Sequence, residues 1–128
     1  MSKVRVAIVG CGAFAEGQHL PNCVARPDVE VVALCDLRRE RLEELTGRFG
    51  LRDALLTTDP AAVFARPDVD AVLAATNHDA HLALVEAAAR AGKHLLIEKP
   101  MTMAHAESLQ VLRLVQASGI KLCVDYNR

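Results

Sequence analysis

The sequence predicts a doubly wound α/β fold: one domain of three layers, built on a parallel sheet with strand order 3-2-1-4-5-6. Two observations support this prediction. Six short apolar runs alternate with longer amphipathic or alanine-rich segments along the 128 residues, which is the pattern of repeated strand–helix units. The apolar runs also lack a polar face, as strands do when helices cover the sheet on both sides.

Each expected element follows from its own hydrophobic pattern and is closed by turn residues. The strands are expected at residues 4–9, 29–35, 54–57, 69–75, 94–97 and 121–124. The helices are expected at residues 13–26, 37–49, 61–65, 80–91 and 102–117. Gly50, Gly92 and Gly119 end three of the helices, because glycine accepts the left-handed conformation found after a helix. Asp59 and Pro60 open the short third helix as an N-cap followed by a first-turn proline.

The first strand leads without a polar spacer into the glycine turn Gly10-Cys11-Gly12. A helix is expected directly after this glycine turn, and it stops before Pro27, which cannot continue a helix. The functional interest lies in the glycine turn at the start of that helix. Such a turn brings backbone N–H groups and the positive end of a helix dipole to a phosphate. In the pattern G-x-G-x-x-A, Gly10 supplies the turn and Gly12 the space for a pyrophosphate. Glycine pairs also occur in plain turns, so the motif alone leaves both interpretations open.

The second strand ends on Asp36, in the place where dinucleotide-binding sheets carry an acidic residue. A carboxylate there accepts hydrogen bonds from the adenosine ribose and repels a 2′-phosphate, which favours NAD as cofactor. Arg38 is near enough in sequence to reach a 2′-phosphate, so NADP stays open. The structural alternative is that Asp36 only caps the next helix.

Polar residues also follow the fourth and fifth strands. We expect Thr76 and Asn77 to line the cofactor groove, with His81 in the first turn of the next helix. Asn77, His78 and His81 offer no fixed third ligand for zinc, so no metal site is expected. After the fifth strand, the segment 98–100 reads Glu-Lys-Pro, and the proline restricts the conformation of the lysine. This charged pair is expected to face the crevice; a solvated ion pair is the alternative.

Composition narrows the classes of function. Hydrophobic residues make up 52% and charged residues 24% of the chain, and the net charge is −1. A balanced surface argues against nucleic acid and membranes as partners, and no apolar run approaches the ~20 residues of a membrane span. The four cysteines have no C-x-x-C spacing, which favours reduced thiols. Two glycines interrupt the N-terminal apolar run, so a signal peptide is not expected and the cytoplasm is the predicted location.

Taken together, these motifs resemble the glucose-fructose oxidoreductase, inositol dehydrogenase and rhizopine-catabolism (Gfo/Idh/MocA) family. The similar stretches are VAIVGCGAFAEGQHLP, VEVVALCD, DAVLAATNHDAHLALVEAAARAGKHLLIEKPM and KLCVDYNR. They cover nearly the whole chain in the right order, and AGKHLLIEKP is the most specific of them.

The resemblance implies that residues 1–128 form an N-terminal Rossmann domain that binds NAD or NADP and serves hydride transfer to or from a sugar, cyclitol or related alcohol. It assigns the diphosphate to the glycine loop, the ribose to the residues after the second strand, and the nicotinamide end to the Glu-Lys-Pro motif. The cofactor-binding residues it implies are Gly10, Gly12, Ala13, Phe14, Asp36, Leu37, Arg38, Thr76, Asn77, His81, Glu98, Lys99 and Asn127. Lys99 is also the implied catalytic residue, in contact with the substrate oxygen.

One departure from the family is the length of the chain. Members continue into a second α/β domain that holds most of the substrate pocket, whereas this sequence stops at Arg128. We therefore expect the 128-residue chain to bind the cofactor with little or no turnover, since one wall of a pocket cannot align donor and acceptor carbons. Apolar surface left open near the last strand leads us to hypothesise a homo-oligomer.

Two other functions share the cofactor residues. A non-catalytic sensor or scaffold that binds NAD(P) needs the same glycine loop and Asp36. A methyltransferase that uses S-adenosylmethionine has a similar sheet, but the Glu-Lys-Pro segment has no task in that chemistry.

Overall fold

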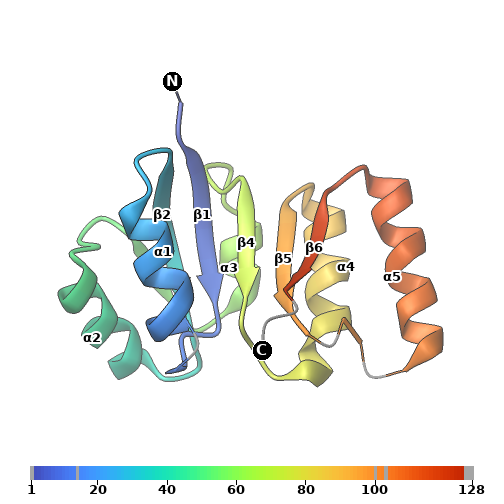
Figure 1. The fold of residues 1–128 in the computed structure, drawn as a ribbon, viewed down its shortest axis with the longest axis horizontal. Helices are drawn as coiled ribbons and strands as arrows, with labels where there is room; N and C mark the ends of the chain where they lie inside the picture. The colour runs from blue at the N-terminus through green and yellow to red at the C-terminus, as the bar shows by residue number, and fades with distance from the viewer. Residues whose placement is uncertain (1, 14, 100, 103, 126–128) are drawn as a thin grey trace.

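The structure is a computed structural model that describes residues 2–13, 15–99, 101, 102 and 104–125, and it confirms the predicted parallel sheet. The strand order is β3-β2-β1-β4-β5-β6, and each neighbouring pair is parallel (Figure 1). The strands are β1 (Val4–Val9), β2 (Val29–Cys35), β3 (Leu55–Thr57), β4 (Ala71–Ala74), β5 (His94–Glu98) and β6 (Leu122–Asp125). The α-helices are α1 (Leu20–Ala25), α2 (Arg39–Phe49), α3 (Pro60–Phe64), α4 (His81–Ala91) and α5 (His105–Ser118).

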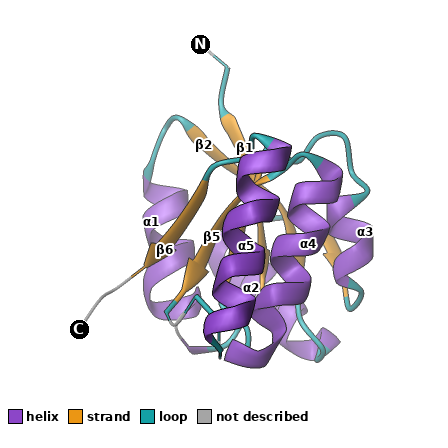
Figure 2. Ribbon diagram, turned by 90° about the vertical axis from the view of Figure 1, so that its right-hand side faces the viewer, coloured by secondary structure: helices purple, strands orange, loops and turns teal. Residues whose placement is uncertain are grey.

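Helices lie on both faces of the sheet, which gives the three expected layers. In Figure 1, α1 lies in front of β1 and β2, and α2 lies beside it, whereas α3 and α4 lie behind the sheet. Figure 2 shows α5 beside α4, and the two helices pack against each other. Because α1 and α2 cover only one half of the front face, the part over β5 and β6 is left open by the helices that the structure describes.

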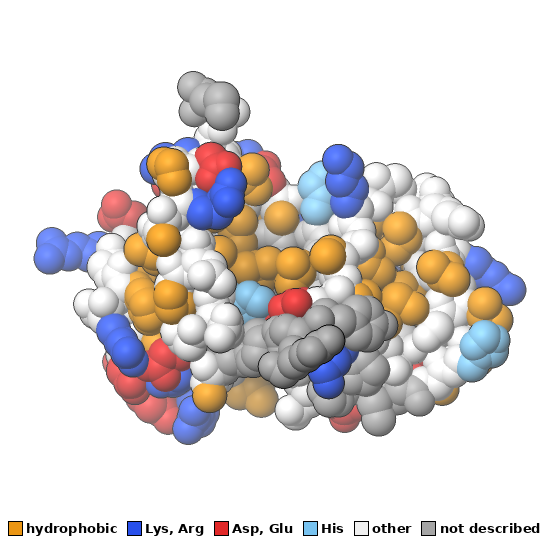
Figure 3. Space-filling model, in the orientation of Figure 1, with side chains coloured by type: hydrophobic (Ala, Val, Ile, Leu, Met, Phe, Trp, Pro, Cys, Tyr) orange, Lys and Arg blue, Asp and Glu red, His pale blue; other side chains and the backbone are white. Residues whose placement is uncertain are grey.

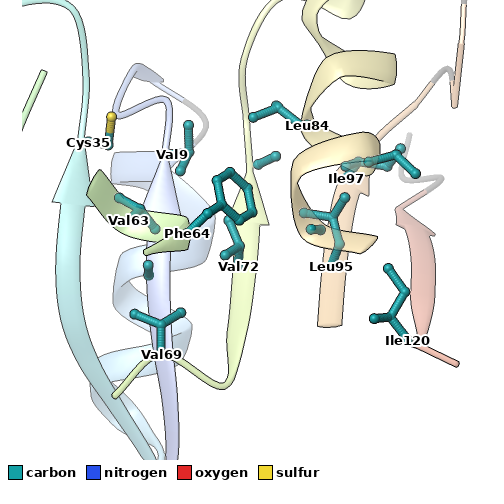
Figure 4. Packing of buried hydrophobic residues seen from close by; sticks show 14 of the residues in the cluster. Val9, Cys35, Val63, Phe64, Val69, Val72, Leu84, Leu95, Ile97 and Ile120 are labelled. Atoms are coloured by element: carbon teal, nitrogen blue, oxygen red, sulfur yellow. The ribbon is translucent and has the colours of Figure 1, made fainter. Parts of the chain in front are cut away.

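Each face of the sheet has its own hydrophobic core. On the side of α3, α4 and α5, Val63 and Phe64 of α3 pack with Val9, Val72 and other buried residues of the strands (Figure 4). The other core, on the side of α1 and α2, is a smaller set of buried residues: Ile8, Cys11, Ala15, Leu20, Val31, Leu34, Leu42 and Leu45. This double burial is the reason why the strands carry no polar face.

The first helix departs from the prediction. Instead of one regular helix over 13–26, a π-helical turn η1 (Ala15–His19) precedes α1, which begins at Leu20. Pro21 lies in the first turn of α1 and has no N–H to donate to a carbonyl four residues earlier. The wider turn brings the chain to this proline, and π turns of this kind are frequent at functional sites.

Other boundaries differ from the prediction by a few residues. The second helix begins at Arg39 and not at 37, because the Arg38 N–H donates to Asp36 Oδ1 at 3.0 Å in a turn. The last helix begins at His105, and a 3₁₀ turn η2 (His78–Ala80) precedes α4. Among the described helices, none has both the length and the apolar character that crossing a membrane requires.

Candidate cofactor-binding site

A pocket of about 500 Å³ opens at the carboxyl ends of β1, β2 and β4, where the strand order changes direction. This is the place where doubly wound sheets bind ligands. Seven of the residues predicted for the cofactor line it: Gly10, Gly12, Asp36, Leu37, Arg38, Thr76 and Asn77. Ala13 is exposed and His81 is fully buried, and neither lines the pocket. Phe14 and Asn127 lie outside the described residues.

Gly10 makes the sharp turn that leaves β1. Its φ is +89°, a conformation that side chains disfavour, and a Cβ built there would lie 2.6 Å from the carbonyl oxygen of Ala75. Its N–H donates to the Cys35 carbonyl at 2.8 Å, so β1 and β2 stay paired up to the turn. A Cβ at Gly12, by contrast, would meet nothing within 4 Å, which leaves open space beside the loop for a ligand.

Asp36 joins the glycine loop to the end of β2. Its Oδ2 accepts the Cys11 N–H at 2.8 Å and its Oδ1 accepts the Arg38 N–H at 3.0 Å. A carboxylate has about four lone-pair directions, so both oxygens can still accept ribose hydroxyls. Asp36 thus holds the loop in shape and presents an anionic acceptor to the pocket.

Arg41 and Glu16 lie behind the same loop, and sequence reasoning missed both. The Arg41 side chain is only 13% exposed, and its Nε donates to the Cys11 carbonyl at 2.8 Å. Its Nη2 donates to Glu16 Oε1 at 2.6 Å, and Arg48 also pairs with Glu16. These hydrogen bonds hold the pKa of Glu16 below and that of Arg41 above the ordinary value. The helical pattern placed Arg41 among five other charged residues on the polar face of α2, and nothing in it singled this arginine out.

The four cysteines are free thiols, as the sequence predicts. Burial raises the pKa of Cys11 to about 12 and that of Cys35 to about 11. Both thiols are therefore protonated at neutral pH, where only a thiolate would be nucleophilic. Cys35 lines the pocket, whereas Cys11 packs into the core on the side of α1 and α2, so both cysteines are packing groups.

A second group of polar side chains lies at the carboxyl ends of β5 and β6. His19, from η1, contacts Glu98 at 2.6 Å between Nε2 and Oε1, and both side chains are largely buried. Glu98 is paired in register with Asp125, whose carbonyl accepts the Lys99 N–H at 3.2 Å. Figure 3, in the orientation of Figure 1, shows a histidine beside an acidic side chain near the centre of the view, below a band of hydrophobic side chains. The sequence indicated Glu98 and Lys99 but gave no sign that His19 would join them.

His19, Glu98 and Asp125 have the chemistry of metal ligands, and one ligand atom from each lies within 4.8 Å of the others. Two ligands that share a tetrahedral Zn²⁺ lie about 3.3 Å apart, given metal–ligand bonds of about 2.0 Å. The 2.6 Å separation of His19 and Glu98 is instead that of a strong hydrogen bond. As placed, these two side chains bind each other, which joins the segment after the glycine loop to the Glu-Lys-Pro segment.

Comparison with known proteins agrees with this geometry. Residues 4–126 match the family model described as "Oxidoreductase family, NAD-binding Rossmann fold", the Gfo/Idh/MocA model. Myo-inositol 2-dehydrogenase of Thermotoga maritima is 30% identical over 98% of this chain and 36% of its own length. The 4-carboxy-2-hydroxymuconate-6-semialdehyde dehydrogenase of a Sphingobium species is 31% identical over 98% of this chain and 39% of its own length.

Among solved structures, the 3-ketoreductase KijD10 of Actinomadura kijaniata, in complex with NADP and TDP-benzene, superposes with a TM-score of 0.88. It is 31% identical to this chain, and the match covers 97% of this chain and 37% of that protein. The chain therefore spans less than two fifths of the length of each of these three relatives.

Proposed function

The chain belongs to the Gfo/Idh/MocA family of oxidoreductases, and from this premise we propose that its pocket holds NAD and that the whole protein transfers hydride to or from a sugar, cyclitol or related alcohol. The observation that carries the proposal is the union of the positive-φ glycine turn with Asp36 in one pocket at the switch point of the sheet. The fold and the NAD(P)-binding class follow from the family match. The activity and the substrate are proposals, because the chain spans less than two fifths of the length of the relatives described above.

The residues present fit a dinucleotide. Side-chain atoms are absent at Gly10 and Gly12, where a diphosphate must approach the backbone, and a Cβ at Gly10 would collide with Ala75. Asp36 supplies the ribose acceptor, and Thr76 and Asn77 form the wall at the end of β4. Ala13, Phe14, His81 and Asn127 remain predicted contacts on the strength of the family resemblance.

We assign NAD ahead of NADP because Asp36 is an anion at the ribose position. The exposed Arg38 lies in the same pocket and offers the opposite charge to a 2′-phosphate. KijD10 was solved with NADP, which keeps NADP as the alternative coenzyme for this chain. The preference of this chain for NAD or NADP depends on whether Asp36 or Arg38 makes the stronger contact with the adenosine ribose.

Lys99 and Glu98 are proposed for the nicotinamide end. The coenzyme, when bound, supplies the hydride acceptor or donor. Lys99 is exposed at the end of β5, directly after the buried pair of His19 and Glu98, which fixes where the segment begins. We assign Lys99 Nζ the task of holding or moving the proton on the substrate oxygen, the usual work of a general acid–base group.

We also propose that the protein is located in the cytoplasm and that it forms a homo-oligomer. Four free thiols, one of them the exposed Cys123, support a reducing compartment. The open part of the sheet face over β5 and β6 carries the half-buried Leu96 and the exposed Cys123, which supports self-association there. Size-exclusion chromatography that gives a monomer at high protein concentration would contradict the oligomer.

Ligand titration tests the proposed coenzyme. NADH is expected to raise the melting temperature and to bind more tightly than NADPH, since a ligand at 100 times its Kd stabilises a protein by about 2.7 kcal/mol. Asp36→Asn is expected to weaken NADH binding and to narrow its advantage over NADPH, because the anion is gone. A shift with S-adenosylmethionine alone would overturn the proposal. Unchanged NADH affinity in Asp36→Asn would overturn the ribose assignment.

A further inference from the structure

We propose that Arg41 is a positioning residue for the coenzyme diphosphate: with Glu16 it holds the glycine loop in its binding shape before the coenzyme arrives. This inference rests on the proposed function, since it concerns the same pocket. Neither residue lines that pocket, and the family resemblance gave neither of them a role.

Cys11, the residue between the two glycines of the loop, is held from both sides. Its N–H donates to Asp36 Oδ2 and its carbonyl accepts from Arg41 Nε, each at 2.8 Å. Both polar groups of Cys11 are thus held by charged side chains from the segment that follows β2. Hydrogen bonds to charged groups are the strong ones in proteins, so the loop is fixed on both sides of this residue.

The direction of these bonds matters for the ligand. In a planar trans peptide, the carbonyl and the next N–H point in opposite directions. Because the Cys11 carbonyl is turned to Arg41, the N–H of Gly12 is turned away from Arg41, and Gly12 lines the pocket. If this peptide rotated, a carbonyl oxygen would replace an N–H on the ligand side and would repel a diphosphate. Arg41 therefore opposes a rotation that would spoil the anion site.

Glu16 keeps Arg41 in place from the other side of the loop. Its backbone N–H donates to the Gly12 carbonyl at 3.1 Å, and its carboxylate accepts from Arg41 at 2.6 Å. The contacts form a closed ring that runs from Cys11 to Arg41, to Glu16 and back to Gly12. Both side chains are mostly buried, at 13% and 22% exposed, so solvent competes little for these hydrogen bonds.

A loop with two glycines has many conformations to lose on binding, and holding it beforehand removes much of that entropic cost. A purely stabilising ion pair would lower the melting temperature when removed but would leave the affinity of the folded protein unchanged. A positioning role affects ligands that carry the diphosphate. Adenosine carries the ribose but lacks the diphosphate, so we expect its affinity to be independent of the loop shape, and it separates the two cases.

The test uses Arg41→Gln, with Arg66→Gln as matched control. Arg66 forms a comparable ion pair with Asp68 at 2.6 Å, in the loop before β4 and outside the pocket. We expect Arg41→Gln to weaken NADH binding roughly tenfold or more, with adenosine affinity unchanged and Arg66→Gln equal to wild type. Glu16→Gln should weaken NADH binding too, and the double variant should lose less than the sum, because the two residues act as a unit.

Two results would overturn the inference alone: NADH affinity at the wild-type level in folded Arg41→Gln, or equal losses for NADH and adenosine. If wild-type protein binds neither NADH nor NADPH, the proposed function fails and this inference fails with it.

Discussion

At the scale of single residues, the pocket depends on a few backbone positions with no tolerance for a side chain. Gly10 combines a φ of +89° with a Cβ position 2.6 Å from a backbone oxygen, and either feature alone would select glycine. Cys11 and Asp36 show the complementary case, in which side chains hold backbone groups of the turn. The site thus depends in part on the absence of a side chain at Gly10.

Gly10→Ala should lower the free energy of unfolding by about 2 kcal/mol or more, through strain in the left-handed region and the clash with Ala75. Gly47→Ala is the matched control, because Gly47 lies within α2 and its Cβ would meet nothing within 4 Å. The control should stabilise the protein by up to about 1 kcal/mol, the helix preference of alanine over glycine. Urea unfolding of both variants measures this, and equal midpoints would show that the turn tolerates a side chain.

At the scale of elements, the strands were predictable and the contacts between distant elements were not. The run from Val6 to Val9 is apolar because these four residues of β1 are buried between the two layers of helices, so a local pattern reports a global environment. The contact of Arg41 with Cys11 joins residues 30 positions apart, and that of His19 with Glu98 joins residues 79 apart. Such pairs depend on how the helices pack on the sheet, and no local sequence pattern encodes this packing.

The π-helical turn was not predicted either, because helical periodicity is read over several turns and does not detect a single wide turn.

Arg5 and Asp70 join β1 to the start of β4, and this connection should depend on pH. The Asp70 carboxylate accepts the Arg5 N–H at 2.8 Å and two guanidinium N–H groups at 3.2 and 3.0 Å. The Arg5 side chain and backbone hold the pKa of Asp70 below its ordinary value of 3.8. The stabilisation is therefore complete well above pH 3.8 and is lost as the pH falls below it, through the pKa of the folded state.

Asp70→Asn should accordingly be modestly less stable than wild type at pH 7, with the difference closing as the pH is lowered past 3.8. Thermal melts from pH 7 to pH 2.5 measure this, and Asp53→Asn, at an exposed loop position, is the control. A difference between wild type and Asp70→Asn that stays constant over this range would show that the carboxylate charge does not matter.

At the scale of the whole molecule, a coenzyme pocket alone does not make a catalyst. The chain matches less than two fifths of each of the three relatives described above, and Lys99 is exposed directly after the end of β5. Hydride transfer requires donor and acceptor carbons in contact, which demands enclosure on more than one side. We therefore expect coenzyme binding and turnover to be separable in this chain.

We expect the 128-residue chain by itself to bind NADH while its turnover of myo-inositol or simple sugars with NAD stays at the level of a blank. Calorimetry follows the binding, and nicotinamide absorbance follows the turnover. Sustained turnover by the chain alone would show that these residues complete an active site unaided.

The position of the pocket has a mechanical consequence. One wall comes from the ends of β1 and β2 and the other from the segment after β4, so the cavity straddles the boundary between the two mononucleotide halves of the sheet. A ligand bound there would contact both halves of the sheet and hold them together. Amide protons along the β1–β4 seam would then exchange more slowly in the loaded protein than those at the outer strands, and the two halves would open as one unit.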